Sequence, residues 1–541
     1  MVQKSFPVRT GYLHIPVRGA DPETFYYTEI WADGVMQTEF LIGIAPPGTA
    51  YDHYMPLDVG RYAASEVTLV CREDKAPDDL FDTILPGGTV PEEPLLYPNL
   101  YKEPLRQQIH FSPARGWLND PNGLFYKDGL FHMYFQHSPV ANTHSGMNIS
   151  WGHATTPDGI HFTQHADAIT PRSSRLLVAS GSAIVDEYNL FGLGPDTVLA
   201  VYTDLFALQY HDRPQVTSGG AQNLAISTDG GMTFRPYEGN PIIPVPDGMT
   251  WRDPRIFQLD EQTMCLAVYE TYEGEDCISF YSSSDCRQWQ FRSRILHFYE
   301  CPDLFKLRVE DGDEELWVVY GASGKYLIGR FENYAFTALT QPEYIDFGDC
   351  VYAGQTFSNT PDPTRRIYTA WLRDFGNHGW SPEQSEEGRK AGFCQSMALY
   401  STFRIVKTSL GYRLFRSPIE ALTSLRQQAE TLSLDRPVSL PTPSETLFTL
   451  AEDKDARVTI GNAGFTYCAA DRAITTSSDK VCRLCTPGDI AVRILADTRS
   501  VEIYIQDEAV MSFFVLPEEL TAHSEYPLTA VQYRLKSIWE P

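Results

Sequence analysis

The chain has 541 residues, of which 43% are hydrophobic and 21% are charged. These values are typical of folded globular proteins, and the length is sufficient for several domains. With 43 Lys and Arg against 70 Asp and Glu, the net charge is -27, which repels phosphate backbones and anionic lipids and opposes a nucleic-acid or membrane partner.

The N-terminal segment MVQKSFPVRTGYLHIPV lacks an apolar run followed by a small-residue cleavage site, so no signal peptide is visible and we expect a cytoplasmic protein. A deleted export signal would overturn this expectation. The ten cysteines are scattered along the chain, which fits free thiols better than a disulfide framework. Cys482 and Cys485 form a lone CxxC without a second pair at zinc spacing, so we expect no metal site.

Residues 1–100 are strand-like and end in the Pro-rich, acidic stretch PGGTVPEEPLLYPNLYKEP, whose composition marks a domain boundary. We expect a small β-rich accessory domain here. Polysaccharide binding, packing against the rest of the chain and dimerisation are all compatible with this segment, and a homo-oligomer could form through this domain or through the C-terminal one.

Residues 108–420 contain short runs rich in β-branched and aromatic residues, separated by Gly, Pro, Asn and Asp. A weak repeat places an Asp-containing turn before an aromatic strand start at Asp158, Asp229 and Asp285. This spacing suits four strands with loops per blade, which favours a β-propeller, although coincidental hairpin turns would give the same pattern.

Residues 416–433 carry apolar side chains at Ile419, Leu422 and Leu425, and this spacing predicts a linker helix. Beyond it, the segments ARVTIGNAGFTYCAA and IAVRILADTRSVEIYIQ alternate apolar and polar residues, as strands with one solvated face do. We therefore predict a separate β-sandwich over residues 434–541.

Three acids stand out by their local context. Asp120 lies in the turn-forming segment GWLNDPNGLF directly before a strand, where it either projects into a cleft or caps an ordinary Asx turn. Asp253 follows Arg252 in TWRDPRIF, where the arginine could keep the carboxylate ionised or could form an ordinary surface ion pair with it. Glu300 lies among apolar and aromatic residues in HFYECPDLF, where burial would favour the protonated form needed for a proton donor; a structural partner is the alternative.

Taken together, the ordered motifs WLNDPNG, WRDPRIF and YECPDLF resemble those of glycoside hydrolase family 32, which includes invertases, levanases and inulinases. Further matching segments extend the resemblance over most of the chain: YFQHSP (134–139), SWGHA (150–154), GSAIVD (181–186), YAGQTF (352–357) and ILADTRSVEIYI (494–505). The resemblance implies an all-β fold in which a five-bladed β-propeller is followed by a C-terminal β-sandwich.

The resemblance also implies roles for individual residues. Asp120 would be the nucleophile, Glu300 the acid/base and Asp253 the group that holds fructose hydroxyls, with no metal or organic cofactor. The expected substrate-binding residues are Asn119, Gln136, Ser182 and Arg252.

The implied activity is release of fructose from β-fructofuranosides such as sucrose, fructo-oligosaccharides, inulin and levan, with a small-molecule or oligosaccharide substrate as partner. We expect exo-action, because a five-bladed funnel closes around a terminal residue. Two alternatives stay open: a fructosyltransferase or difructose-anhydride-processing enzyme, and a non-catalytic carbohydrate-binding protein. The acidic trio argues against the binder, which needs no nucleophile.

Overall fold

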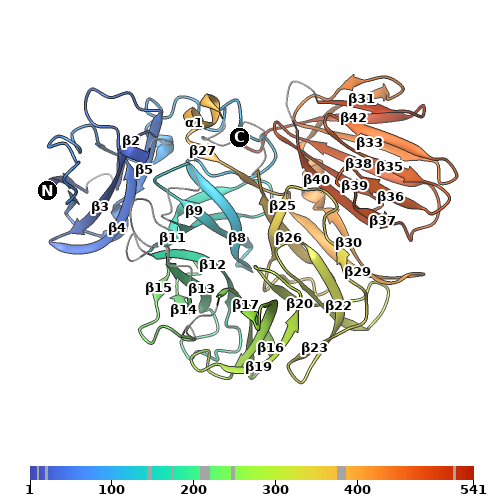
Figure 1. The fold of residues 1–541 in the computed structure, drawn as a ribbon, viewed down its shortest axis with the longest axis horizontal. Helices are drawn as coiled ribbons and strands as arrows, with labels where there is room; N and C mark the ends of the chain where they lie inside the picture. The colour runs from blue at the N-terminus through green and yellow to red at the C-terminus, as the bar shows by residue number, and fades with distance from the viewer. Residues whose placement is uncertain are drawn as a thin grey trace.

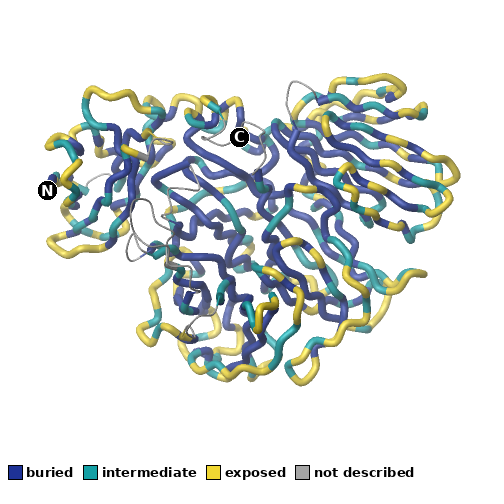
Figure 2. Tube along the Cα trace, in the orientation of Figure 1, coloured by how far each residue is buried: buried dark blue, intermediate teal, exposed yellow. Residues whose placement is uncertain are grey.

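The computed structural model describes residues 1–8, 11–18, 22–142, 149–171, 176–206, 220–244, 250–374, 385–515 and 520–540. Within these ranges the chain is almost entirely β-structure, arranged as an N-terminal module, a central propeller and a C-terminal sandwich (Figure 1). This architecture confirms the predicted all-β fold. Buried strands fill the interior of each part, and exposed segments gather in the outer loops (Figure 2).

The N-terminal module consists of two antiparallel sheets within the described residues. In sheet order, the first contains β1 (Val2–Pro7), β6 (Glu66–Cys71), β3 (Phe25–Ala32) and β4 (Val35–Gly43), and the second contains β5 (His53–Asp58), β2 (Tyr12–Val17) and β7 (Leu85–Gly87). Their facing side chains, among them Ile15, Phe40 and Leu69, form one buried core. Because residues two apart on a strand share a face, this core accounts for the apolar positions of the segment.

The propeller has five blades in the part of the chain that the structure describes. Blade 1 contains β8 (Gly116–Lys127), β9 (Leu130–Ser138), β10 (Ser150–Thr156) and β11 (Thr163–Ile169); blade 2 contains β12 (Leu176–Val185), β13 (Val198–Phe206), β14 (Ala221–Ser227) and β15 (Arg235–Pro236). Blade 3 contains β16 (Trp251–Asp260), β17 (Thr263–Tyr272), β18 (Glu275–Ser283) and β19 (Gln290–Leu296); blade 4 contains β20 (Asp303–Arg308), β21 (Glu315–Tyr320), β22 (Lys325–Glu332), β23 (Ala335–Ala338) and β24 (Glu343–Tyr344). Blade 5 contains β25 (Val351–Thr356), β26 (Arg366–Leu372), β28 (Ser396–Met397), β29 (Ser401–Thr408) and β30 (Gly411–Pro418).

The first strands of neighbouring blades, β8, β12, β16, β20 and β25, contact one another and so surround the propeller axis. Helix α1 (Glu386–Ala391) leads into β27 (Phe393–Cys394), which pairs in parallel with the start of β8. A short piece of chain near the end of the propeller thereby joins blade 1 and closes the ring.

The repeated Asp turn is a feature of the blades. Asp158, Asp229 and Asp285 each lie between the third and fourth strands of a blade, and each carboxylate accepts hydrogen bonds from backbone N–H groups of its own turn. Asp and Asn favour such turns because their short side chains bond to the backbone a few residues on. The repeat in the sequence is therefore structural.

The C-terminal sandwich has two antiparallel sheets in the described chain. One contains β31 (Arg426–Ser433), β42 (Thr529–Leu535), β33 (Ser444–Leu450), β38 (Ile490–Ala496), β39 (Ser500–Ile505) and β40 (Ala509–Phe514); the other contains β32 (Val438–Ser439), β41 (Thr521–Ser524), β34 (Ala456–Ile460), β35 (Ala463–Cys468), β36 (Ala473–Thr476) and β37 (Val481–Arg483). Strand β31 starts before residue 434, where the sequence places the start of this domain.

The predicted linker helix over 416–433 is wrong. Only Glu420–Leu425 is helical, as the 3-10 helix η5, and the following residues form strand β31 paired with β42. The apolar residues of this segment recur every third position, which is the period of a 3-10 helix rather than of an α-helix. Pairing with an available sheet edge then overrides the helix-forming composition of the residues that follow.

Both outer parts pack on the propeller. On the N-terminal side, Phe25 and Leu41 contact Ala141, and Thr38 donates a hydrogen bond to the Pro171 carbonyl at 2.7 Å. On the other side, His110 lies between two carboxylates of the sandwich. Among the described residues, the helices are too short and polar to cross a membrane.

Candidate active site

The three predicted acids come from three different blades. Asp120 lies in β8, at a register shift between Leu118 and Pro121 where the ladder to β9 is interrupted. Asp253 lies in β16, inside a second register shift relative to β17. Glu300 lies in the turn directly before β20. Such irregularities re-aim side chains that would otherwise alternate between the faces of a strand.

The backbone at two of these acids adopts a left-handed conformation. The φ angle is 60° at Asp253, 49° at Glu300 and 41° at Cys301. Residues other than glycine adopt this region infrequently, at a cost on the order of 1 kcal/mol or more each, and such residues cluster at functional sites. The surrounding structure therefore holds these acids in an orientation that the local chain does not prefer.

The carboxylates converge around Cys301. Its thiol lies 3.5 Å from Oδ2 of Asp120 and 3.5 Å from Oδ2 of Asp253, and its backbone N–H donates to the same Asp253 oxygen at 3.1 Å. Arg252 lies on the other side, with Nε 3.7 Å from Asp253 and Nη2 2.5 Å from Oε1 of Glu300. These contacts bring all three acids into one site.

The surroundings of Glu300 differ from the predicted apolar environment. Its carboxylate accepts hydrogen bonds from Arg252 and from the Tyr352 hydroxyl at 2.5 Å, and its side chain is 21% exposed. The prediction of an apolar pocket was wrong because the partners of Glu300 come from distant segments, whereas the aromatic residues next to it in sequence include the exposed Tyr299.

Burial and mutual repulsion both perturb the acids. Burial raises the pKa of Asp120, and the charge of Glu300 adds to this effect, while hydrogen bonds from Ser180 and Asn119 oppose it. Burial also raises the pKa of Asp253 to about 7, against the lowering effect of Arg252 and with further raising by Glu300 and Asp120. Like charges that share a water-poor site disfavour simultaneous ionisation.

Three of the four predicted substrate-binding residues lie next to the acids or in the neighbouring strand. Asn119 precedes Asp120 and accepts a hydrogen bond from the Trp117 indole at 3.0 Å. Arg252 makes the contacts described above. Gln136 is buried in β9, and its amide donates to the Val178 carbonyl at 3.0 Å.

Ser182 has a different role from the one predicted. It is fully buried, and its hydroxyl donates to the Pro254 carbonyl at 2.8 Å and accepts from the Ile256 N–H at 2.7 Å. It thus links the backbones of blades 2 and 3. The serine that contacts the site is Ser180, whose hydroxyl donates to Oδ2 of Asp120 at 2.6 Å.

Sequence reasoning missed Ser180, Cys301 and Tyr352 as site residues. Each lies in or beside a segment that carries the family resemblance, so proximity to those motifs was the available signal. Among the residues that the structure describes, no three His, Cys, Asp or Glu side chains gather in a way that could hold a metal ion. The expected independence from cofactors stays a prediction.

The fold and the site define a five-bladed propeller with an appended β-sandwich and three acids at the propeller centre, an arrangement suited to cleaving glycosidic bonds. Residues 110–418 match the domain described as "Glycosyl hydrolases family 32 N-terminal domain", and residues 395–533 match "Glycosyl hydrolases family 32 C terminal". The chain belongs to glycosyl hydrolase family 32, as the motifs predict. Residues 1–109 lie outside both matches.

Known relatives agree with this placement. The chain is 33% identical over 307 residues to an invertase of Wickerhamomyces anomalus, covering 50% of this chain and 52% of that protein. It is 33% identical over 300 residues to an extracellular exo-inulinase of Meyerozyma guilliermondii, covering 50% of this chain and 55% of that protein. The chain thus spans about half the length of the curated relatives it matches.

A solved structure shows the same fold. The exo-inulinase from Aspergillus awamori superposes with a TM-score of 0.67 at 22% sequence identity, over 81% of this chain and 100% of that chain.

Proposed function

We propose that this chain is a retaining glycosidase that releases terminal fructose from β-fructofuranosides. The observation that carries the proposal is the convergence of Asp120, Asp253 and Glu300 around Cys301 and Arg252. Retaining glycosidases need one carboxylate to attack the anomeric carbon and a second to move a proton. The relatives named invertase and exo-inulinase support fructose as the sugar.

Asp120 is the proposed nucleophile. The Ser180 hydroxyl and the Cys301 thiol both contact its Oδ2, so Oδ1 is the oxygen left to form a bond to the anomeric carbon of fructose. As that bond forms, the glycosidic bond breaks and its electron pair goes to the departing oxygen. Glu300 donates a proton to that oxygen, so the leaving sugar departs as an alcohol.

The second step reverses these roles. Glu300 takes a proton from water, the water oxygen attacks the anomeric carbon, and the bond to Asp120 breaks to release fructose and restore the carboxylate. Arg252 and Tyr352 hold the Glu300 carboxylate from two sides, which fixes its position in both steps. Asp253 accepts hydrogen bonds from ring hydroxyls. These hydrogen bonds become stronger in the transition state, because positive charge develops on the sugar beside the negative carboxylate.

The test compares Asp120→Asn, Glu300→Gln and a control, Asp196→Asn, whose side chain is 88% exposed. On sucrose and on inulin, we expect the control to retain full activity. Loss of the proton donor should lower kcat by roughly 10²- to 10⁴-fold, and loss of the nucleophile should lower it at least as far. On an activated fructoside whose leaving group departs without a proton, azide should restore turnover in Glu300→Gln, because it attacks the fructosyl-enzyme without needing a base and forms a fructosyl azide of unchanged anomeric configuration.

Product analysis by NMR separates the remaining features of the proposal. Fructose that first appears as the β-anomer and without longer intermediates supports retention and exo-action. Full activity in either acid variant, or fructose that first appears as the α-anomer, would refute the assignment of the two carboxylates. Products that require a sugar acceptor in place of water would assign the chain to fructosyl transfer.

A further inference from the structure

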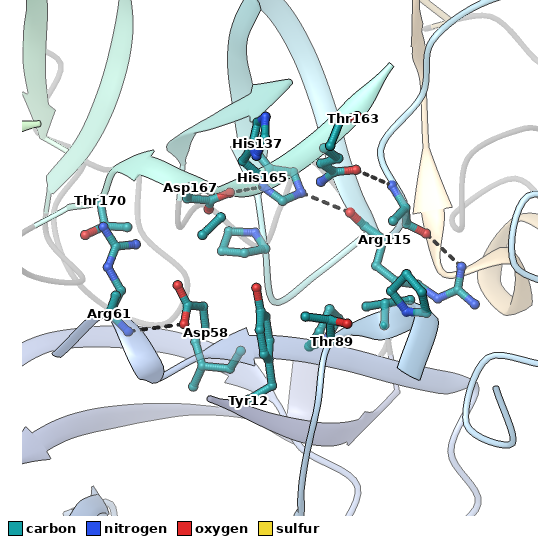
Figure 3. Close-up of a pocket in the computed structure, with 18 of the residues that line it drawn as sticks. Tyr12, Asp58, Arg61, Thr89, Arg115, His137, Thr163, His165, Asp167 and Thr170 are labelled. Atoms are coloured by element: carbon teal, nitrogen blue, oxygen red, sulfur yellow. Dashed lines mark hydrogen bonds and ion pairs between the residues drawn. The ribbon is translucent and has the colours of Figure 1, made fainter. Parts of the chain in front are cut away.

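A cavity of about 420 Å³ lies between the N-terminal module and blade 1 (Figure 3). We refer to it as the junction cavity. Its lining includes none of Asp120, Asp253 and Glu300. The volume falls within the range of sites that bind small molecules.

The two sides of the junction cavity come from separate sheets. Tyr12 and Asp58 are directly opposite on β2 and β5, so their side chains share one face of the module. On the propeller side, Thr163, His165 and Asp167 of β11, the outer strand of blade 1, line the cavity. Figure 3 shows Tyr12 and Asp58 pointing across the cavity toward Asp167.

Aromatic rings and hydrogen-bonding groups line this space together. The Phe and Tyr side chains of the lining are Tyr12, Phe40, Tyr62, Tyr101 and Phe162. Flat rings provide an apolar face with which the C–H face of a sugar ring can pack, and hydroxyl, amide and carboxylate groups match sugar hydroxyls. Gln164, Thr89 and Thr170 also line the cavity.

Asp167 lines the cavity and has one carboxylate oxygen that no described residue contacts by a hydrogen bond. Its side chain is 9% exposed, and Oδ1 lies 2.7 Å from Nδ1 of His137. Its other oxygen, Oδ2, is buried and has no hydrogen-bond partner among the described residues. A buried carboxylate oxygen without a partner costs free energy, so the Asp167 carboxylate gains by turning this atom toward a hydroxyl of a molecule bound in the cavity.

The charges around the cavity are balanced. His137 contacts the Asp167 carboxylate and, through Nε2 at 2.9 Å, the Arg115 carbonyl. Both partners only accept, so both ring nitrogens carry protons and the ring is positive. Burial lowers its pKa, but Asp167 more than offsets this and the pKa is raised. Asp58 and Asp167 thus face His137 and Arg61, while Arg115 is paired with Glu103 at 2.7 Å.

This balance favours a neutral ligand over an ion of either sign. We propose that the junction cavity is a non-catalytic binding site for a neutral mono- or disaccharide unit. The ligand's hydroxyls donate to Asp167 and Asp58 and share a hydrogen bond with the Tyr12 hydroxyl, and its ring packs on the Tyr12 ring. Burial, with the charges of Asp58 and Asp167, raises the pKa of Tyr12 to about 12, so its hydroxyl keeps its proton and can donate or accept a hydrogen bond.

The experiment measures sucrose binding by titration calorimetry in the inactive Asp120→Asn protein, so that no sugar is consumed. The choice of sucrose rests on the proposed function. We expect two saturable sites, one in the active centre and one in the junction cavity. Adding Tyr12→Ala should abolish one site, and adding Tyr12→Phe should weaken it by about tenfold through loss of a hydrogen bond. Tyr188, which is 49% exposed and outside the lining, provides the control Tyr188→Ala.

Thermal unfolding checks that each variant is folded. If Tyr12→Ala does not fold, the more conservative Tyr12→Phe still tests the proposal. A single site in Asp120→Asn, or two sites of unchanged affinity in a folded Tyr12 variant, overturns the proposal. Hydrolysis of sucrose by the wild-type chain is measured in parallel, and we expect Tyr12→Phe to leave its rate unchanged. Absence of hydrolysis would refute the proposed function, whereas hydrolysis with one binding site would refute this inference alone.

Discussion

Raising the pH above neutrality is expected to weaken the contact between propeller and sandwich at His110. The His110 ring is fully buried, with Nδ1 2.8 Å from Oδ2 of Asp497 and Nε2 3.2 Å from Oε1 of Glu502. Both partners are carboxylates, so both ring nitrogens carry protons. Burial alone would lower the pKa of His110, but the two carboxylates raise it to about 9.

The sign and size of the effect follow from this pKa. The folded value lies above the unfolded value of 6.5, so the stabilisation is complete below pH 6.5 and is lost as the pH rises through about 9. At about 1.4 kcal/mol per pH unit of difference, the contribution amounts to roughly 3 kcal/mol. This is a large part of the free energy of unfolding of a typical domain.

Urea unfolding between pH 6 and pH 9.5 measures the effect. The wild-type midpoint should fall across the upper part of this range, whereas His110→Gln should start lower and stay nearly flat. The control is His161→Gln, because His161 also contacts an aspartate, at 2.7 Å, but its side chain is 53% exposed. The reasoning is refuted if the wild-type and His110→Gln midpoints fall in parallel with pH.

Three further predictions concern the propeller centre. The folded pKa of Asp253 is raised from 3.8 to about 7, so the fold loses stability as the pH rises from about 4 to 7. Asp253→Asn should therefore have a higher free energy of unfolding than wild type at pH 8, by roughly 4 kcal/mol, but not at pH 4. A lower midpoint at pH 8 would contradict this. Arg255 and Asp303 form a fully buried ion pair at 2.8 Å, so Asp303→Asn should cost about 3 to 5 kcal/mol in denaturant unfolding, and a loss below 1 kcal/mol would show that the pair is dispensable. Ser182→Ala should lower stability by about 1 to 3 kcal/mol without changing KM for sucrose, whereas Ser180→Ala should lower kcat with little effect on stability; the opposite pattern would restore Ser182 as a sugar ligand.

The sequence predicted the fold and singled out the three acids through the family resemblance, whose motifs are local. Short aromatic strands, turn residues and the repeated Asp turns identify blades, and each acid lies in a motif that can be read within ten residues. The helix prediction at 416–433 failed for the opposite reason, since pairing of β31 with a strand about 100 positions later decides its structure.

The details of the site depend on contacts that no local segment contains. Ser180 and Ser182 are two positions apart and would share a face in a regular strand. A register shift between Val178 and Gly181 breaks this alternation, which leaves Ser180 facing Asp120. The partners of Glu300 are likewise 48 and 52 residues away in the chain.

The pairing of β27 with β8 affects when the protein can become active during its synthesis. Asp120 lies in β8, but the start of that strand receives its parallel neighbour only from Phe393 and Cys394. A nascent chain must therefore emerge from the ribosome as far as Cys394, between β26 and β28 of the fifth blade, before the nucleophile's strand has its final partner. We expect shorter nascent chains to lack a finished catalytic centre, even though every acid has already been translated.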